Sequence, residues 1–405
     1  MKRTTMKKTI AIGVIVLTGL AGVVGGCDNG NGSPFPPGIL GYSYIDTSSY
    51  NDTLPQAAFD GTNSLVVYDE IITSSDHNII GAFVDQTGNA LSYVNIETAA
   101  TDDQAPQVAF DGANYLVVYQ EDNGADHDIM GVFVSPISPI NPMGLVGTPF
   151  PIDTSSNDDL TPAVAFNGTD YLVAYQRAVS GTNGDIVGAV VDTTGAVLAG
   201  SPFTIDASAD DDIAPAVASN GTTFLVAYQR VAGRTSDDIM GAIVDPAVSA
   251  TPPAVTLFNI DASTYDDQAP AVASDGTNYL VAYQEVFSTD RDIVGSLVTV
   301  AGTPTATFIP IDTFTGTDDY QPRVAWGGTR YLVAYTETYS STDHDILGAR
   351  ITPAGKVQSR AFAIDTTPND DFSPAVVFGA TSYLVPYQEM VGSSDNNIIG
   401  ALVKP

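Results

Sequence analysis

Short apolar runs separated by turn residues recur along almost the whole chain, and they predict β-strands. In residues 171–175 (Tyr-Leu-Val-Ala-Tyr) every position is apolar, so both alternating faces of the predicted strand are hydrophobic. A strand of this kind is covered on both sides. Its β-branched and aromatic residues favour strands, and the Asn-Gly and Asp-Gly pairs between runs favour hairpin turns. We find no helical period after residue 26.

These runs belong to a unit that occurs seven times, whose clearest part is Pro-Ala-Val-Ala-x-x-Gly-Thr-x-Tyr-Leu-Val-Ala-Tyr-Gln-Glu. An Asp-Ile-x-Gly segment follows, and then an Ile-Asp-Thr/Ala-Ser segment leads into an Asp-Asp pair. In the third unit, strands are predicted over 163–166, 171–176, 185–191 and 203–206. The leading prolines are 51 to 56 residues apart: Pro55, Pro106, Pro162, Pro215, Pro270, Pro322 and Pro374.

Four strands in each repeat of this length predict an all-β, seven-bladed β-propeller with four-stranded blades over residues 39–405. Independent tandem domains of this size would bury too little core to fold alone. The seventh unit stops after its third strand, and an unpaired fourth strand is found at the other end, in residues 42–48. We therefore expect this N-terminal outer strand to complete the last blade and remove its open edge.

The N-terminal segment has a positive start followed by an apolar run from 9 to 26 and then Cys27, the only cysteine in the chain. These are the features of a secretory signal peptide. The run resembles the lipobox of bacterial lipoproteins, which implies that residues 1–26 are removed, that Cys27 is lipidated, and that 27–38 form a flexible tether. The implied location is the bacterial cell envelope, exported and lipid-anchored, with the membrane leaflet left open. An ordinary signal peptide or an uncleaved anchor is the alternative.

The chain is strongly acidic, with 47 Asp and Glu against 14 Lys and Arg, a formal charge of −33. Four of the basic residues lie in the signal segment, so the mature chain has 10 − 47 = −37. This charge argues against binding to nucleic acid or to anionic lipid headgroups. Of the acids, 41 are Asp, a residue typical of turns and cation sites.

Two acidic segments recur in most repeats, one before the proline and one before the Ile-x-Gly, and both are expected on one rim of the propeller. They have two interpretations: Ca²⁺ sites, since Ca²⁺ prefers carboxylate and carbonyl oxygens, or aspartates that cap turns. No cofactor is certain, and Ca²⁺ is the candidate. Its candidate ligands are Asp102, Asp103, Asp126, Asp128, Asp158, Asp159, Asp211, Asp212, Asp266, Asp267, Asp290, Asp292, Asp318, Asp319, Asp343, Asp345, Asp370 and Asp371.

Departures from the repeat are where a unique ligand site would be found. Five repeats end the second strand with Glu, whereas the third and fourth have Arg177 and Arg230. Together with Arg234 and Arg291 they form a candidate basic site for a carboxylate or sulfate ligand. Salt bridges to neighbouring aspartates are the alternative. The three histidines, His77, His127 and His344, occupy equivalent positions between the second and third strands.

Catalysis has little support in the sequence. The single cysteine is at the lipidation site, and we find neither a G-x-S-x-G segment nor a phosphate-binding loop. The Ser-x-Asp-x-Gly-x-x-Trp boxes of sialidases are also missing. The repeat, Y-L-V-A-Y-Q…D-I-x-G, resembles that of bacterial secreted propellers in surface lipoproteins. The predicted function is therefore an envelope-anchored scaffold that presents an acidic face to a protein or glycan partner. The alternative is a carbohydrate-active hydrolase or lyase acting at the channel mouth, and the oligomeric state stays open.

Overall fold

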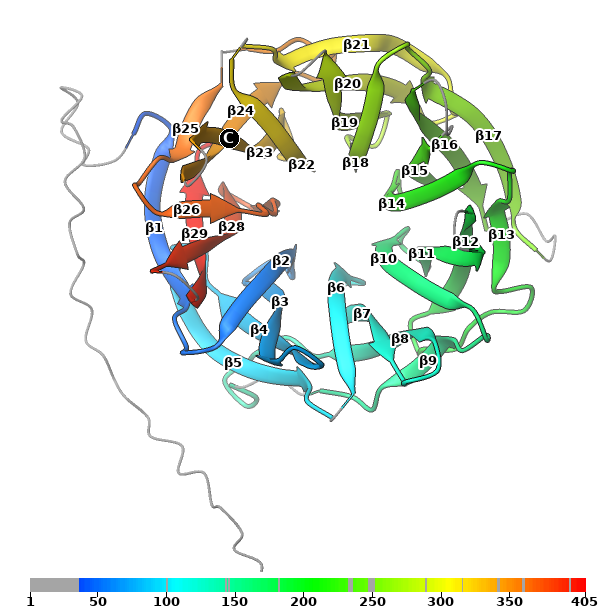
Figure 1. The fold of residues 1–405 in the computed structure, drawn as a ribbon. Helices are drawn as coiled ribbons and strands as arrows, with labels where there is room; N and C mark the ends of the chain where they lie inside the picture. Colours follow the sequence, from blue (N-terminus) through cyan, green and yellow to red (C-terminus); the bar gives the residue numbers. More distant parts are fainter. Residues whose placement is uncertain are drawn as a thin grey trace, which may run out of the picture.

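The computed structural model is an all-β ring of seven antiparallel blades, which confirms the predicted propeller (Figure 1). It describes residues 36–405 apart from 100, 143, 145, 181–182, 232–235, 247–251, 288–289, 315, 341–342, 359–360 and 393–394. The predicted signal peptide, Cys27, nearly all of the tether and Arg234 lie outside the described residues.

Each blade runs from an inner strand through two middle strands to an outer strand, and we number the blades 1 to 7 from the one that begins with β2. The inner strands are β2 (Asn51–Phe59), β6 (Asp102–Phe110), β10 (Asp158–Phe166), β14 (Asp211–Ser219), β18 (Asp266–Ser274), β22 (Asp318–Trp326) and, in two pieces, β26 (Asp370–Phe372) and β27 (Val377–Gly379). The second strands are β3 (Ser64–Thr73), β7 (Tyr115–Asp122), β11 (Asp170–Ser180), β15 (Phe224–Val231), β19 (Asn278–Phe287), β23 (Tyr331–Ser340) and β28 (Ser382–Val391).

The outer half of each blade is also regular. The third strands are β4 (Asp76–Val84), β8 (His127–Val134), β12 (Asn183–Asp192), β16 (Asp237–Asp245), β20 (Asp290–Thr299), β24 (Asp343–Ile351) and β29 (Asp395–Val403). The outer strands are β5 (Ala90–Glu97), β9 (Phe150–Asp153), β13 (Phe203–Asp206), β17 (Ala254–Asp261), β21 (Pro304–Asp312), β25 (Phe362–Asp365) and β1 (Ile39–Asp46).

The ring is closed by the N-terminal strand. β1 pairs antiparallel with β29, with Tyr42 opposite Ala401, so the first strand is the outer strand of blade 7 (Figure 1). Lys404 N also donates a hydrogen bond to Gly38 O at 2.8 Å. The predicted closure is confirmed, and the edge of the last blade is covered by a strand from the opposite end of the chain.

The inner strands begin earlier than the sequence predicted, and the reason is a repeated bulge. In blade 3, β10 starts at Asp158 rather than at residue 163, and its register with β11 shifts between Leu160 and Ala163. Thr161 in this bulge has a φ of 49°. The residue before the leading proline has a positive φ in every blade: Leu54, Ala105, Thr161, Ala214, Ala269, Gln321 and Ser373. Proline disfavours the right-handed α region for the residue before it. The bulge gives the inner strand one more residue than the second strand, and this extra residue has no partner in the ladder. The Asp-Asp pairs thus lie in strands rather than in loops.

The core lies between the blades, because the second strand of each blade packs on both neighbours. In β11, Tyr171, Val173 and Tyr175 belong to a cluster with residues of blade 2. Leu172 and Ala174 face the other way, into a cluster with residues of blade 4. All five side chains are fully buried. This confirms that the second strand is covered on both faces, and each large side chain buried there contributes roughly 1.5–3 kcal/mol.

The glycine of each Asp-Ile-x-Gly segment is required by close packing of the outer strand. A Cβ atom added to Gly241 would lie 2.6 Å from Cζ of Phe258, and one added to Gly188 would lie 2.9 Å from Cδ1 of Ile205. Distances this short force the neighbours to move, so only glycine fits without repacking.

Candidate functional site at the blade junctions

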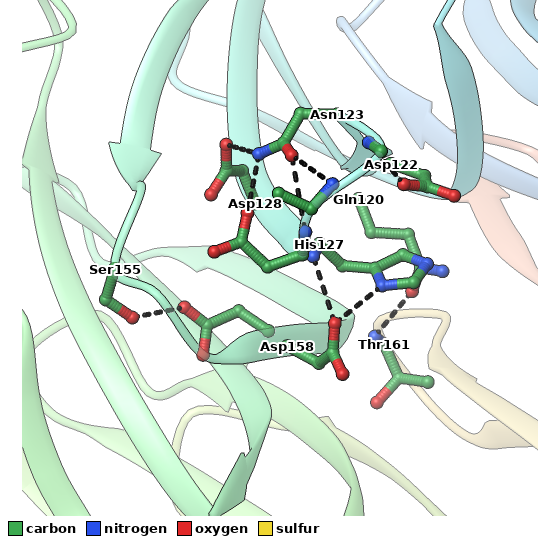
Figure 2. A network of polar contacts seen from close by, with 12 residues as sticks. Gln120, Asp122, Asn123, His127, Asp128, Ser155, Asp158 and Thr161 are labelled. Atoms are coloured by element: carbon green, nitrogen blue, oxygen red, sulfur yellow. Dashed lines mark hydrogen bonds and ion pairs between the residues drawn. The ribbon is translucent and has the colours of Figure 1, made fainter.

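In five of the six Asp-Asp pairs, the first aspartate accepts a backbone hydrogen bond from the preceding blade. At the junction of blades 2 and 3, the backbone N–H of His127 in β8 donates to Oδ1 of Asp158 in β10 at 3.2 Å (Figure 2). Equivalent backbone bonds reach Asp211 (2.7 Å), Asp266 (3.1 Å), Asp318 (3.1 Å), Asp370 (3.0 Å) and, at the closing junction, Asn51 (3.1 Å). These bonds also show that the two acidic segments meet on one face of the ring, as the sequence predicted.

The histidines reinforce the same link. Nδ1 of His127 lies 2.9 Å from Oδ1 of Asp158, and Nδ1 of His344 lies 2.5 Å from Oδ1 of Asp370. The hydrogen bond from His127 lowers the pKa of Asp158. His127 and His344 thus pair with the inner strand of the next blade, whereas Nδ1 of His77 is farther from its counterpart, 3.8 Å from Oδ1 of Asp102.

The second aspartate of each pair is fully buried at the junction, and in two junctions it is held by arginine. At junction 2–3, Arg177 donates from Nε to Oδ1 of Asp159 (2.8 Å) and from Nη2 to its Oδ2 (3.0 Å). Nη2 also donates to Asp153, at the end of β9 in the preceding blade. The hydroxyl of Tyr175 donates to the same Asp153 carboxylate. One guanidinium therefore bridges two carboxylates from two blades, in the bidentate geometry that Arg favours.

Junction 3–4 repeats this arrangement. Arg230 donates to Asp212 at 2.8 and 3.0 Å and to Asp206 at 2.7 Å, and Tyr228 donates to Asp206. The side chains of Arg177 and Arg230 are only 19% and 16% exposed, so their donors are turned inward. Arg291 is exposed and lies 3.3 Å from Asp318. Three arginines of the candidate basic site are thus in salt bridges to aspartates, as the alternative interpretation proposed. Arg177 and Arg230 also lie at separate junctions.

The other five junctions place a glutamate where the arginine would be. We call them acid junctions: each brings together an acid at the end of the preceding outer strand, the second acid of the pair, and the glutamate directly opposite it across the ladder. Their members are Asp46, Asp52 and Glu70; Glu97, Asp103 and Glu121; Asp261, Asp267 and Glu285; Asp312, Asp319 and Glu337; and Asp365, Asp371 and Glu389.

Burial raises the pKa of the second aspartate at both kinds of junction, but Arg177 and Arg230 oppose the rise at Asp159 and Asp212, and the acid junctions have no such cation among the described residues. Burial, and then repulsion by the neighbouring carboxylates, raises the pKa of Asp103 and Asp267 to about 8, that of Asp52 and Asp319 to about 9, and that of Asp371 to about 10. Within the described part of the chain, both carboxylate oxygens of Asp319 and Asp371 are buried without a hydrogen-bond partner. Carboxylates in this state hold a proton or attract a cation.

The aspartates before the Ile-x-Gly lie beside these clusters. Asp128 is 7% exposed and accepts a hydrogen bond from Nδ2 of Asn123 at 2.9 Å (Figure 2). Burial and neighbouring carboxylates raise the pKa of Asp345 to about 7 and that of Asp292 to about 6. Across the described residues, no group of three or more His, Cys, Asp or Glu is arranged to hold a metal ion.

Sequence reasoning missed the outer-strand acids and the tyrosine hydroxyls as members of this site. The sequence did contain a signal, because Ile-Asp and Asp-Asp recur in nearly every repeat, and every repeat has a tyrosine followed two residues later by Glu or Arg. What the repeat alone does not indicate is that the Ile-Asp of one blade meets the Tyr of the next.

Two cavities bear on function. One, of about 420 Å³, lies at the inner strands and is lined by Ala, Pro, Val, Leu, Thr, Gln and Arg323, so its lining contains no carboxylate. The other, of about 640 Å³, lies at junction 5–6, where its walls include Asp312, Phe314 and Glu337.

Comparison with known proteins identifies the fold alone. No family model and no curated protein matches the chain. Similar solved structures include a protein of unknown function from Dyadobacter fermentans (10% identity, 91% of this chain and 99% of that chain, TM-score 0.54). A Trypanosoma rangeli sialidase (9%, 87% and 55%, 0.50) and a prolyl endopeptidase (14%, 88% and 47%, 0.50) are similar as well. The chain spans about half the length of these last two. None of the described residues forms a helix with the length and apolarity needed to cross a membrane.

Proposed function

We propose that the protein is an exported, lipid-anchored scaffold of the bacterial cell envelope, which presents the acidic face of its propeller to a protein or glycan partner. The observation that supports this most is the set of five acid junctions, all on the face formed by the inner-strand starts and the loops between second and third strands. A partner that brings positive charge or hydrogen-bond donors to this face gains from carboxylates that the fold leaves without a cation.

A binding role suits the rigidity of the site. The acids are held by β-ladders and by cross-blade hydrogen bonds, so little ordering is needed when a partner docks. The alternative, a hydrolase or lyase at the channel mouth, needs a pair of carboxylates. The residues that line the cavity at the inner strands supply none. A screen for reducing sugar released from polysaccharides tests that alternative directly.

The binding role is tested by neutralising the acidic face. In Asp158→Asn with Asp266→Asn, charge is lost while an amide oxygen can still accept the bonds from the preceding blade. The matched control is Asp111→Asn with Asp275→Asn, in turns on the opposite face, where each carboxylate accepts a local backbone N–H. Binding of the full chain to glycans and purified envelope proteins, followed by interferometry, should weaken in the first variant only. Equal loss in both variants would contradict the proposal.

The anchor and the calcium prediction have their own tests. A Cys27→Ser chain should leave the membrane fraction and fail to incorporate labelled fatty acid, and retention of either property would refute lipidation at this cysteine.

The binding of Ca²⁺ by the acidic face remains a prediction. Because a ligand of the folded state raises the melting temperature, a melt of the full chain with Ca²⁺ and then with EDTA shows whether the folded chain takes up the ion.

A further inference from the structure

The acid junction between blades 5 and 6 differs from an internal cluster because it opens into a cavity. Asp312, at the end of β21, and Glu337, on β23, both line the cavity of about 640 Å³. Pro310, Leu347 and Val357 supply apolar walls. A lining that combines carboxylates with apolar side chains suits a ligand with an aliphatic stem and a cationic head. The volume is within the usual range for ligand pockets, roughly 300–1,000 Å³.

The chain itself shows what the carboxylates of this junction can hold. Asp319 is opposite Glu337 in the ladder, as Asp159 is opposite Arg177 and Asp212 is opposite Arg230. In the two arginine junctions, a guanidinium fills the space between the inner-strand aspartate and the outer-strand aspartate of the preceding blade. At junction 5–6 both aspartates are retained as Asp319 and Asp312, and the described residues place no cation between them.

Within the acid junction of Asp312, Asp319 and Glu337, as the structure describes it, the carboxylate without hydrogen bonds is that of Asp319. It is fully buried, and among the described residues neither of its oxygens has a hydrogen-bond partner. By contrast, Asp159, its counterpart in blade 3, accepts two hydrogen bonds from Arg177. Repulsion from Asp312 and Glu337 acts on Asp319, which places the three carboxylates in one electrostatic unit. A buried acceptor of this kind gains most from a charged donor.

We infer that the cavity at junction 5–6 binds the guanidinium group of an arginine side chain from a protein partner. The guanidinium contacts Asp312 and Glu337 and neutralises Asp319 beside them, while its stem lies along Leu347 and Val357. This inference rests on the proposed binding function and specifies its partner chemistry. Arginine suits the site better than Ca²⁺, because Ca²⁺ requires six to eight oxygens around one point, and the described residues form no such cage.

The test uses the full-length chain in detergent, with EDTA, and a short peptide carrying one arginine. Its control peptide has citrulline, which keeps the shape and loses the charge. By calorimetry the arginine peptide should bind at least about tenfold more tightly, in line with the value of a charged hydrogen bond. Equal binding of the two peptides, or of neither, overturns the inference.

The site is located with two arginine transplants. Glu337→Arg should fill the position from within, as in blades 3 and 4, and abolish peptide binding. Glu285→Arg makes the same change at junction 4–5 and should leave peptide binding intact. If Glu337→Arg still binds the peptide, the site is wrong, and the proposed function is then judged separately by the charge-neutralised face variants described above.

Two further experiments test whether the cavity is filled instead by an arginine of the chain itself or by Ca²⁺. In the sequence, Arg360 comes between Gln358 and Ala361, two residues that line the cavity, and Arg360 itself is outside the described residues. If Arg360→Ala alone creates peptide binding that the wild type lacks, the site is filled from within the chain and the inference fails. It also fails if Ca²⁺ raises the melting temperature of the wild type but not of Glu337→Arg, while the arginine peptide does not bind.

Discussion

Replacing Glu285 by arginine should stabilise the protein, because it converts an acid junction into the arginine junction found one blade earlier. Glu285 is directly opposite Asp267, and Arg230 is directly opposite Asp212. Glu285 is 5% exposed and Asp267 is fully buried, so solvent screens their repulsion poorly. The new guanidinium would reach Asp267 and Asp261 as Arg230 reaches Asp212 and Asp206.

The size of the effect follows from the pKa of Asp267. Burial and the nearby acids raise this pKa from 3.8 to about 8. A group whose pKa is raised by folding loses stability as the pH rises from the unfolded to the folded value. At 1.36 kcal/mol per pKa unit, this shift lowers the free energy of unfolding by about 4 kcal/mol at pH 7 and about 2 kcal/mol at pH 5. An arginine restores only part of that free energy, because burial still raises the pKa of Asp212 beside Arg230. We expect Glu285→Arg to raise the free energy of unfolding by about 2 kcal/mol at pH 7 and by about 1 kcal/mol or less at pH 5.

Urea unfolding followed by circular dichroism, with EDTA at both pH values, measures this gain. Glu285→Gln is the matched control: it removes the repelling charge without adding a cation, so its gain should be smaller. The converse variant, Arg230→Glu, should destabilise the protein more at pH 7 than at pH 5. A gain for Glu285→Arg that is equal at the two pH values, or a loss at pH 7, would refute the electrostatic account of the junctions.

Three other perturbations test the fold. Arg177→Met leaves Asp153 and Asp159 without their cation and should cost about 3 kcal/mol in urea unfolding at pH 7; a change below 1 kcal/mol would show that the bridge contributes little. Gly241→Ala places a Cβ 2.6 Å from the Phe258 ring and should cost about 1–3 kcal/mol, whereas Gly41→Ala, with nothing within 4 Å, should unfold like the wild type. Deleting residues 36–46 removes β1, so light scattering should show association through the exposed β29 edge, and an unchanged monomer with an unchanged melting temperature would argue against closure by this strand.

The candidate site was only partly predictable. The repeat placed the Asp-Asp pairs and the glutamate-for-arginine exchange at equivalent positions, and their convergence on one face followed from blade topology. The pairing of Asp159 with Arg177 required the inner strand to start before Pro162, which the bulge at Thr161 makes possible. The residues before the seven prolines include Leu, Ala, Thr, Gln and Ser, so no residue type marks this bulge in the sequence.

The sequence by itself determined the seven blades, the apolar second strands and the closure by the N-terminal strand, because these depend on local periodicity and on counting strands. Only the tertiary structure decided what the acids do. Asp153 ends one blade while Tyr175 and Arg177 belong to the next, so the sites form between blades where two chain segments are desolvated together. Burial and charge at such an interface depend on the neighbour across the gap. At equivalent positions of the repeat, Asp159 is therefore paired with Arg177, whereas the pKa of Asp319, which is opposite Glu337, rises to about 9.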